Sequence, residues 1–262
     1  DVSIAIADHY KPRFEGDEMP SSIGGVIISI ADRIDTMISC FENNAIPTGS
    51  RDPWGIRRSM IAIVRMIIEF DLPLNIELLL EDATITLDKK IGENTRKCHD
   101  FFKKRVETVF LDNEITPELI QLLDQRLLSD TIGCFKNALT LIQLKAEDSA
   151  NYSLLIDTTT RVSKIIQNKT TSATVQVNQF KEDIEIKAHN ELQNIHDVQD
   201  QWLLQPESRQ QVLQFCQILS TYFELVLINA EDQDLARNRQ AFMNDVNLYF
   251  NAVGDWLKLS KV

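Results

Sequence analysis

Apolar side chains recur every three or four residues along most of this chain, the spacing that places them on one face of a helix. The clearest case is the segment from Ile56 to Phe70, which predicts a helix with one buried face. No segment alternates apolar and polar residues long enough to predict a strand. We therefore predict an all-α fold with essentially no sheet. Helices are expected at residues 1–8, 22–42, 53–71, 75–89, 95–111, 117–127, 130–144, 149–168, 178–202, 207–227 and 234–259, with a Thr-rich loop at 169–177.

Charge and cysteine content restrict the function. The 39 acidic residues outnumber the 27 basic ones and give a net charge of −12, which opposes binding to a polyanion unless the cations gather on one face. No apolar run reaches eighteen residues, so no membrane span is expected. The four cysteines form no C-x-x-C pair, which predicts buried free thiols in a reducing cytoplasm and no metal site. Candidate basic clusters are Arg51/Arg57/Arg58/Arg65, Lys97/Lys103/Lys104/Arg105 and Arg237/Arg239.

The start of the helix at residues 53–71 carries an unusual pair of charges. Asp52 can cap this helix, and Pro53 suits its first position, where an N–H group is not needed. Arg57 and Arg58 follow about one turn later, although the positive end of a helix dipole disfavours cations. The two guanidinium groups therefore need an anionic partner. The candidates are Asp32 and Asp35 on the preceding helix, or a phosphate group.

Three short segments resemble the signatures of a known family. Residues 47–58 read PTGSRDPWGIRR and resemble P-T-G-x-x-D-P-F-A-L-R-R. Residues 9–17 read HYKPRFEGD and resemble H-Y-K-P-R-F-A-G-D, while ADRIDT at 31–36 resembles A-D-K-L-D-T-L. These signatures occur in the same order in the bacterial glycyl-tRNA synthetase β subunit. Three ordered matches within about seventy residues are far more specific than one.

A weaker resemblance continues toward the C-terminus. Residues 232–240 resemble the x-L-R-x-N-R-L segment of the anticodon-binding domain that ends this family and the arginyl-tRNA synthetases. Asn238 and Arg239 match it, and Arg237 lies one place off. Residues 222–229 and 160–166 resemble two further segments of that domain, but polar positions are replaced in both. These replacements are expected to affect the affinity of this domain for RNA more than they affect its fold.

The resemblance implies a domain arrangement and a function. Residues 1–74 would be the C-terminal half of an HD-like domain, 75–148 a helical connector and 149–262 an anticodon-binding helical bundle. The chain would be a C-terminal fragment of the β subunit of a cytoplasmic α2β2 glycine–tRNA ligase. The α subunit would hold ATP and Mg and attach glycine, and the β subunit would bind tRNA(Gly). No catalytic residue, cofactor or metal is expected in this fragment, which has no Gly-rich phosphate loop, nucleophile elbow or H-E-x-x-H motif.

The residues expected to contact tRNA are mostly cationic. The set is Tyr10, Lys11, Arg13, Arg57, Arg58, Arg161, Arg237, Asn238 and Arg239. The first three could instead form a solvated loop, and Arg161 and Arg239 could instead form structural ion pairs. If Arg239 contacts tRNA directly, its replacement by alanine weakens binding with little change in melting temperature. The acidic charge and the replaced polar residues also leave open a helical adaptor, or a degenerate paralogue without tRNA binding.

Overall fold

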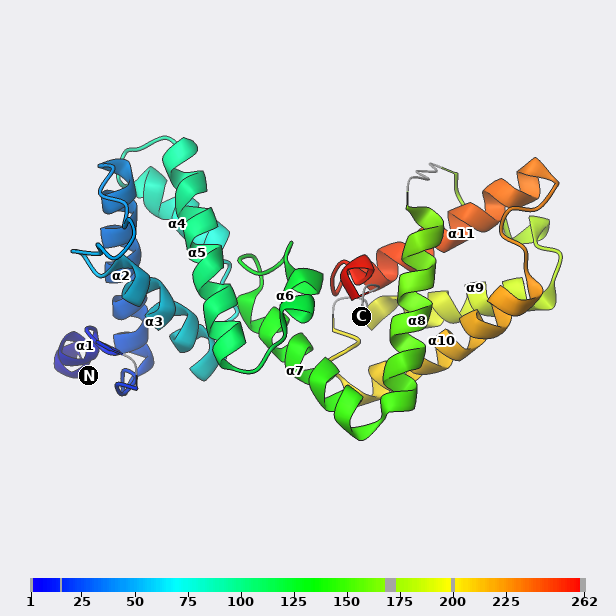
Figure 1. The fold of residues 1–262 in the computed structure, drawn as a ribbon, viewed down its shortest axis with the longest axis horizontal. Coiled ribbons are helices and arrows are strands. Elements are labelled where there is room, and N and C mark those ends of the chain that lie inside the picture. Colours follow the sequence, from blue (N-terminus) through cyan, green and yellow to red (C-terminus); the bar gives the residue numbers. More distant parts are fainter. Residues whose placement is uncertain (1, 15, 168–172, 199–200, 260–262) are drawn as a thin grey trace. The chain divides into compact units, whose positions relative to one another are not determined.

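The described parts of the chain fold into helices joined by turns and irregular loops. The computed structural model describes residues 2–14, 16–167, 173–198 and 201–259. Within these ranges it contains helices and turns but no strand, and Thr48 and Arg51 form an isolated antiparallel bridge (Figure 1). The predicted all-α fold is confirmed. No helix of the described residues combines the length and the apolar character that a membrane crossing requires.

The contacts divide the chain into two compact units. Unit 1 comprises Asp1–Thr116 and Arg126–Phe135, and unit 2 comprises Pro117–Gln125 and Lys136–Val262. The helix α7 (Thr131–Glu147) contributes residues to both ranges. The predicted divisions near residues 74 and 148 rest on resemblance, and they remain a prediction.

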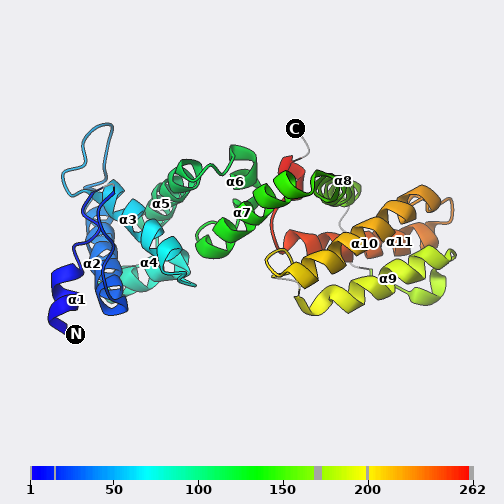
Figure 2. The ribbon, with the colours of Figure 1, turned by 90° about the horizontal axis from the view of Figure 1, so that it is seen from below.

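Unit 1 is built around one long central helix. This helix is α2 (Ile23–Glu42), and α1 (Val2–Asp8), α3 (Ile56–Glu69), α4 (Ile76–Thr86) and α5 (Glu93–Asp112) all pack against it (Figure 2). The hydroxyl group of Ser22 caps α2 by accepting a hydrogen bond from the Gly25 N–H at 3.2 Å. The helices α3 and α5 also pack against each other. Their apolar faces are buried, with Ile63, Val64, Phe102 and Val106 fully inaccessible.

The helix α3 begins three residues later than predicted. The residues after Asp52 form a turn in which the Gly55 N–H donates to the Asp52 carbonyl (3.1 Å). Gly55 adopts the left-handed conformation (φ 66°), and the helix starts at Ile56. Asp52 still acts as a cap, because its carboxylate accepts hydrogen bonds from the backbone N–H groups of Ile56 (2.8 Å) and Arg57 (3.0 Å). The prediction was therefore right that Asp52 bonds to the first N–H groups of the helix, but Gly55, not Asp52, occupies the N-cap position.

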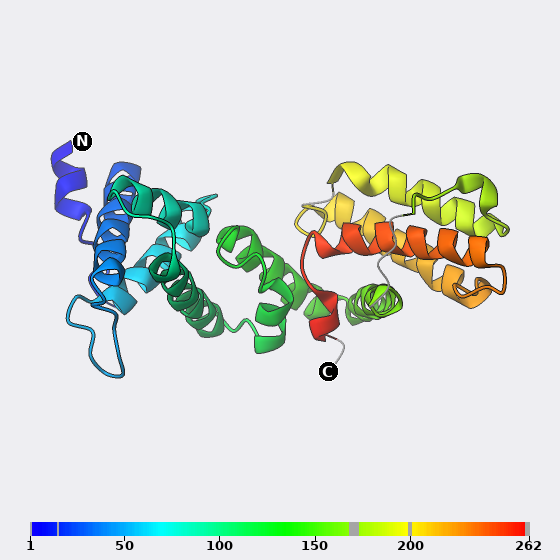
Figure 3. The same cartoon turned by 90° about the horizontal axis from the view of Figure 1, so that it is seen from above.

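Unit 2 is a bundle of helices with an aromatic core. Its helices are α6 (Pro117–Leu123), α8 (Ser149–Ile166), α9 (Asp183–Ile195), α10 (Pro206–Leu225) and α11 (Gln233–Asn251). Figure 3 shows α9, α10 and α11 as neighbouring coils, and α8 packs against α10 and α11. Trp202 stacks near Tyr249 and Trp256, with ring centroids 6.4 and 6.3 Å away. These rings are buried in the core of unit 2.

Three predicted helices of unit 2 are shorter than expected, and the first of them, predicted over 117–127, ends at Leu123. The segment predicted as one helix over 178–202 consists of a 3-10 turn (Val177–Gln179), α9 and a second 3-10 turn (His196–Val198). The last helix ends at Asn251 instead of continuing to 259, and a 3-10 helix (Trp256–Leu259) follows. A Cβ atom at Gly254, which follows the end of α11, would lie 2.3 Å from the Leu122 carbonyl oxygen, so this close approach requires glycine.

Candidate nucleic-acid interface

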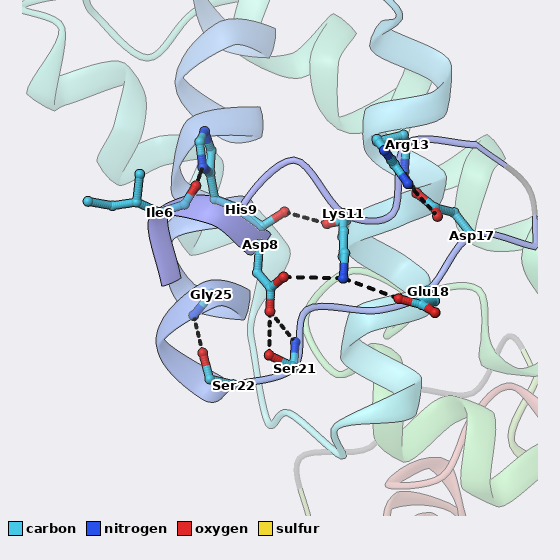
Figure 4. Close-up of polar contacts among 11 residues, drawn as sticks. Ile6, Asp8, His9, Lys11, Arg13, Asp17, Glu18, Ser21, Ser22 and Gly25 are labelled. Atoms are coloured by element: carbon cyan, nitrogen blue, oxygen red, sulfur yellow. Dashed lines mark hydrogen bonds and ion pairs between the residues drawn. The ribbon is translucent and has the colours of Figure 1, made fainter. Parts of the chain in front are cut away.

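The loop after α1 is held together by its own ion pairs, as Figure 4 shows. The Asp8 carboxylate accepts hydrogen bonds from the backbone N–H (2.8 Å) and the hydroxyl group of Ser21. Lys11 lies 3.2 Å from Asp8 and 3.2 Å from Glu18. The hydrogen bonds from Ser21, and then Lys11, lower the pKa of Asp8 to about 2. Lys11 therefore closes this loop, and it has two carboxylate partners within the chain.

Arg13 and Asp17 form a second closure of the same loop. The Nε and Nη2 atoms of Arg13 donate to the two carboxylate oxygens of Asp17 at 2.9 and 3.1 Å, and the Arg13 backbone N–H adds a bond of 2.7 Å (Figure 4). These hydrogen bonds from Arg13 hold the pKa of Asp17 well below its usual range. Asp17 is buried, but 60% of the Arg13 side chain remains exposed. Arg13 can therefore contact a ligand while it stays paired.

Arg33 of α2 fixes this loop by bonding to its backbone carbonyl groups. Its Nη2 atom donates to the carbonyl oxygens of Tyr10 and Pro12, both at 2.9 Å. The Ser29 hydroxyl group donates to the Lys11 carbonyl at 3.0 Å. Sequence reasoning did not select Arg33, since its carbonyl partners lie more than twenty residues earlier in the chain. Tyr10 stays 66% exposed, and its ring lies 4.0 Å from that of His9.

A cavity of about 770 Å³ brings two of the sequence motifs together. Arg13 lines it from the loop, and Arg58 and Arg65 line it from α3. Phe14 and Asp112 are among its other lining residues. We call this site the arginine cavity; its full lining is Pro12, Arg13, Phe14, Gly16, Arg58, Ile61, Ala62, Arg65, Thr108, Val109, Asp112 and Asn113. Its lining thus includes three arginines and one acidic residue, the exposed Asp112.

The position of Arg58 depends on the turn before α3. Its guanidinium group folds back over Gly55, where an added Cβ atom would lie 3.0 Å from Nη2. The expected partners Asp32 and Asp35 are exposed, and within the described part of unit 1 neither forms an ion pair with Arg57 or Arg58. That expectation was wrong. The guanidinium group of Arg57 instead lies over the ring of Phe101.

Two of the candidates in unit 2 are buried. Asn238 is 3% exposed, and its side chain bonds to the Gln176 backbone twice, at 2.7 and 3.0 Å. Arg239 is 6% exposed and pairs with Glu185 on α9. Both side chains therefore hold unit 2 together. Their predicted contact with tRNA remains a prediction, and it requires these bonds to open.

The other two candidates in unit 2 lie at the surface. The guanidinium carbon of Arg161 lies 4.4 Å from the ring centroid of Phe223, and Nη2 donates to the Phe223 carbonyl at 3.4 Å. Arg237 pairs with Asp234 one turn earlier in α11. Both side chains are exposed and could reach an external ligand. Arg237 thus lies at the surface of α11 next to the buried Asn238 and Arg239.

Comparison with known proteins agrees with the motifs. A family model described as the glycyl-tRNA synthetase beta subunit matches residues 1–123. The chain is also 28% identical to the glycine–tRNA ligase beta subunit of Paracidovorax citrulli over 99% of its length.

The chain is similar to the glycyl-tRNA synthetase beta subunit family.

The similarity extends along both units. The beta subunit of Delftia acidovorans is 30% identical over 99% of the chain, and that of Halalkalibacterium halodurans is 27% identical over 93%. The chain spans 36–37% of the length of these beta subunits. Every residue that lines the arginine cavity falls within the region matched by the beta subunit family model. The candidates of unit 2 lie outside that model but inside the aligned length of the relatives.

Proposed function

We propose that this chain is the tRNA-binding portion of the beta subunit of a heterotetrameric, α2β2 glycyl-tRNA synthetase. In this proposal it supports the ATP-dependent attachment of glycine to tRNA(Gly) in the cytoplasm, and the alpha subunit supplies the ATP and Mg site. The observation that carries the proposal is the arginine cavity, where Arg13, Arg58 and Arg65 meet. The family relationship supports the same conclusion.

The cavity has the chemistry that a phosphate backbone requires. Arginine forks bind phosphate oxygens through paired, charge-assisted hydrogen bonds. Arg58 is exposed and Arg65 is half-buried, and neither forms an ion pair among the described residues. The Phe14 ring is 58% exposed at the same cavity and can stack on an unpaired base. A local concentration of guanidinium groups can thus bind RNA although the net charge is −12.

The test is salt-dependent binding of tRNA(Gly) to the complete beta subunit assembled with its alpha subunit. Each lost phosphate contact should weaken binding and reduce the slope of log K against log salt by about one. We expect this result for Arg58→Gln and for Arg65→Gln. Arg96→Gln is the matched control, because Arg96 is exposed on α5 and does not line the cavity. Equal behaviour of all three variants would contradict the proposal.

One observation favours a second candidate function, a helical adaptor that does not bind tRNA. Lys11, Arg13 and Arg239 are all engaged with carboxylates of the same chain, which reduces the positive charge available to RNA. An assembled enzyme whose wild-type beta subunit gives no tRNA binding even at low salt would support the adaptor.

A further inference from the structure

Two guanidinium groups share one aromatic ring between α3 and α5. The guanidinium carbon of Arg105 lies 4.6 Å from the ring centroid of Phe101, and that of Arg57 lies 5.8 Å from it. A ring face attracts a cation and can fix its position. Phe41 of α2 packs against Phe101 in an edge arrangement, with centroids 5.8 Å apart. The ring and both arginines are therefore held by side chains of unit 1.

This pair of cations has no carboxylate partner in the described structure. The Nε atom of Arg105 is buried and makes no hydrogen bond, and within the described residues neither guanidinium group forms an ion pair. The negative charge of Asp52 acts on Arg105 by raising its pKa. Its two carboxylate oxygens already accept the N–H groups of Ile56 and Arg57.

An unpaired buried donor beside a like charge calls for an explanation. Buried polar groups in proteins nearly always have a hydrogen-bond partner, so each exception needs an explanation. Burial, and then the charge of Arg57, lower the pKa of Arg105. The charged guanidinium group is therefore less favourable at this position than in water. A bound anion would offset the repulsion between the two guanidinium groups.

We propose that Arg57 and Arg105, positioned by Phe101, bind the phosphate backbone of RNA next to the arginine cavity. This inference rests on the proposed function. The two sites follow each other along the same pair of helices: Ile61 of the cavity lies one turn after Arg57, and Val109 lies one turn after Arg105. One RNA strand can therefore contact both. A single carboxylate of a partner protein could satisfy these two arginines, but it would not extend into the arginine cavity as an RNA strand would.

The same geometry indicates what this site does not read. Guanidinium groups lie over the Phe101 ring, so the ring supports the arginines and is not offered to a base for stacking. Contacts to phosphate carry no sequence information. The site therefore contributes equally to tRNA(Gly) and to other tRNAs, and discrimination lies elsewhere.

The test is Arg105→Met in the complete beta subunit assembled with its alpha subunit, because methionine keeps the packing on Phe101 but removes the charge. We expect binding of tRNA(Gly) and of a non-cognate tRNA to fall by the same factor, about tenfold, with a salt slope smaller by about one. The melting temperature should stay nearly unchanged. Lys104→Met is the control, because Lys104 is exposed on the same helix and should alter binding less than twofold.

The outcomes separate this inference from the proposed function. If Arg58→Gln and Arg65→Gln weaken binding but Arg105→Met behaves like Lys104→Met, the inference fails and the proposed function stands. A loss confined to tRNA(Gly) would assign base recognition to the site and also overturn it. A large fall in melting temperature with the loss of binding would show a structural role. If the wild-type enzyme binds no tRNA at any salt concentration, both proposals fail.

Discussion

Glu185 and Arg239 join α9 to α11 through two hydrogen bonds, although 54 residues separate them. The Nε and Nη2 atoms of Arg239 donate to the carboxylate oxygens at 2.8 and 2.9 Å. The same carboxylate accepts the backbone N–H groups of Lys181 and Glu182, both at 2.9 Å. Burial raises the pKa of Glu185, but the hydrogen bonds from Arg239 and the backbone outweigh it and leave the pKa lowered. One ion pair thus fixes both a helix start and a helix contact.

Replacing Arg239 by alanine should destabilise the protein strongly. The change would leave the Glu185 carboxylate buried without its cation and the Leu227 carbonyl without its donor, which lies 2.9 Å away. Breaking a buried pair in this way typically costs about 3–5 kcal/mol. We therefore expect a clear fall in the melting temperature and in the free energy of unfolding, measured by thermal and urea denaturation. The expectation from sequence, weaker tRNA binding at nearly unchanged stability, is revised.

Arg237 provides the control for this experiment two residues away. Its partner Asp234 is exposed, and so is its own side chain, with 76% and 67% of the two side chains accessible. Exposed ion pairs contribute little because water screens them. Arg237→Ala should therefore change the free energy of unfolding by less than about 0.5 kcal/mol. Equal melting temperatures for the two alanine variants would show that the Glu185–Arg239 pair is not a stabilising element.

Acid should loosen the loop between α1 and α2. The pKa of Asp8 is lowered from 3.8 to about 2 by Ser21 and Lys11. A lowered pKa means that the stability contributed by the carboxylate is present above the unfolded value and is lost as the pH falls from about 4 through 2. Asp8→Asn should therefore remove part of the pH dependence of unfolding in this range. Urea denaturation at several pH values measures it, and Asp35→Asn, at an exposed site, should leave that dependence unchanged.

The cysteines should be unreactive in the folded protein. All four are buried and none is disulfide-bonded, and burial raises the pKa of Cys98, Cys134 and Cys216 to about 12. Because the thiolate is the nucleophile, alkylation by iodoacetamide at pH 8 should be slow until the chain unfolds. Cys40 is 8% exposed and should react first as denaturant is added. Rapid labelling of two or more thiols in buffer alone would contradict this packing.

Local sequence patterns predicted most of the fold, and the failures have long-range causes. Ser22 and Asn75 begin helices as expected, because a cap acts on backbone groups only a few residues away. The predicted helix at 178–202 is interrupted because Glu185 captures N–H groups before the helix begins. At its other end Trp202 is buried against Trp256, more than fifty residues later. Helical periodicity cannot reveal such contacts.

The candidate site was predicted only in part for the same reason. The motif at 9–17 contains both partners of the Arg13–Asp17 pair, four residues apart. The sequence therefore contained this pair, but the fold of the loop was needed to recognise it. The roles of Arg65 and Arg105 depend on how α3 packs against α5, and the sequence showed them only as members of basic clusters. Arg239 was expected to contact tRNA because it matches a family segment, while its partner Glu185 lies on another helix. A cation and its partner on different helices cannot be matched from one sequence.

Asn238 should hold the segment before α9 against α11. Removal of its side chain should therefore change the hydrogen exchange of one backbone amide, that of Gln176. The Oδ1 atom accepts the Gln176 N–H at 2.7 Å, and Nδ2 donates to the Gln176 carbonyl at 3.0 Å. Asn238→Ala leaves both backbone groups without their partner, which should cost about 1–3 kcal/mol. Hydrogen exchange at the Gln176 amide should accelerate sharply. Gln240→Ala removes an exposed side-chain bond to Asn229 of 3.2 Å and should leave that amide protected; equal exchange in the two variants would show that Asn238 does not hold this segment.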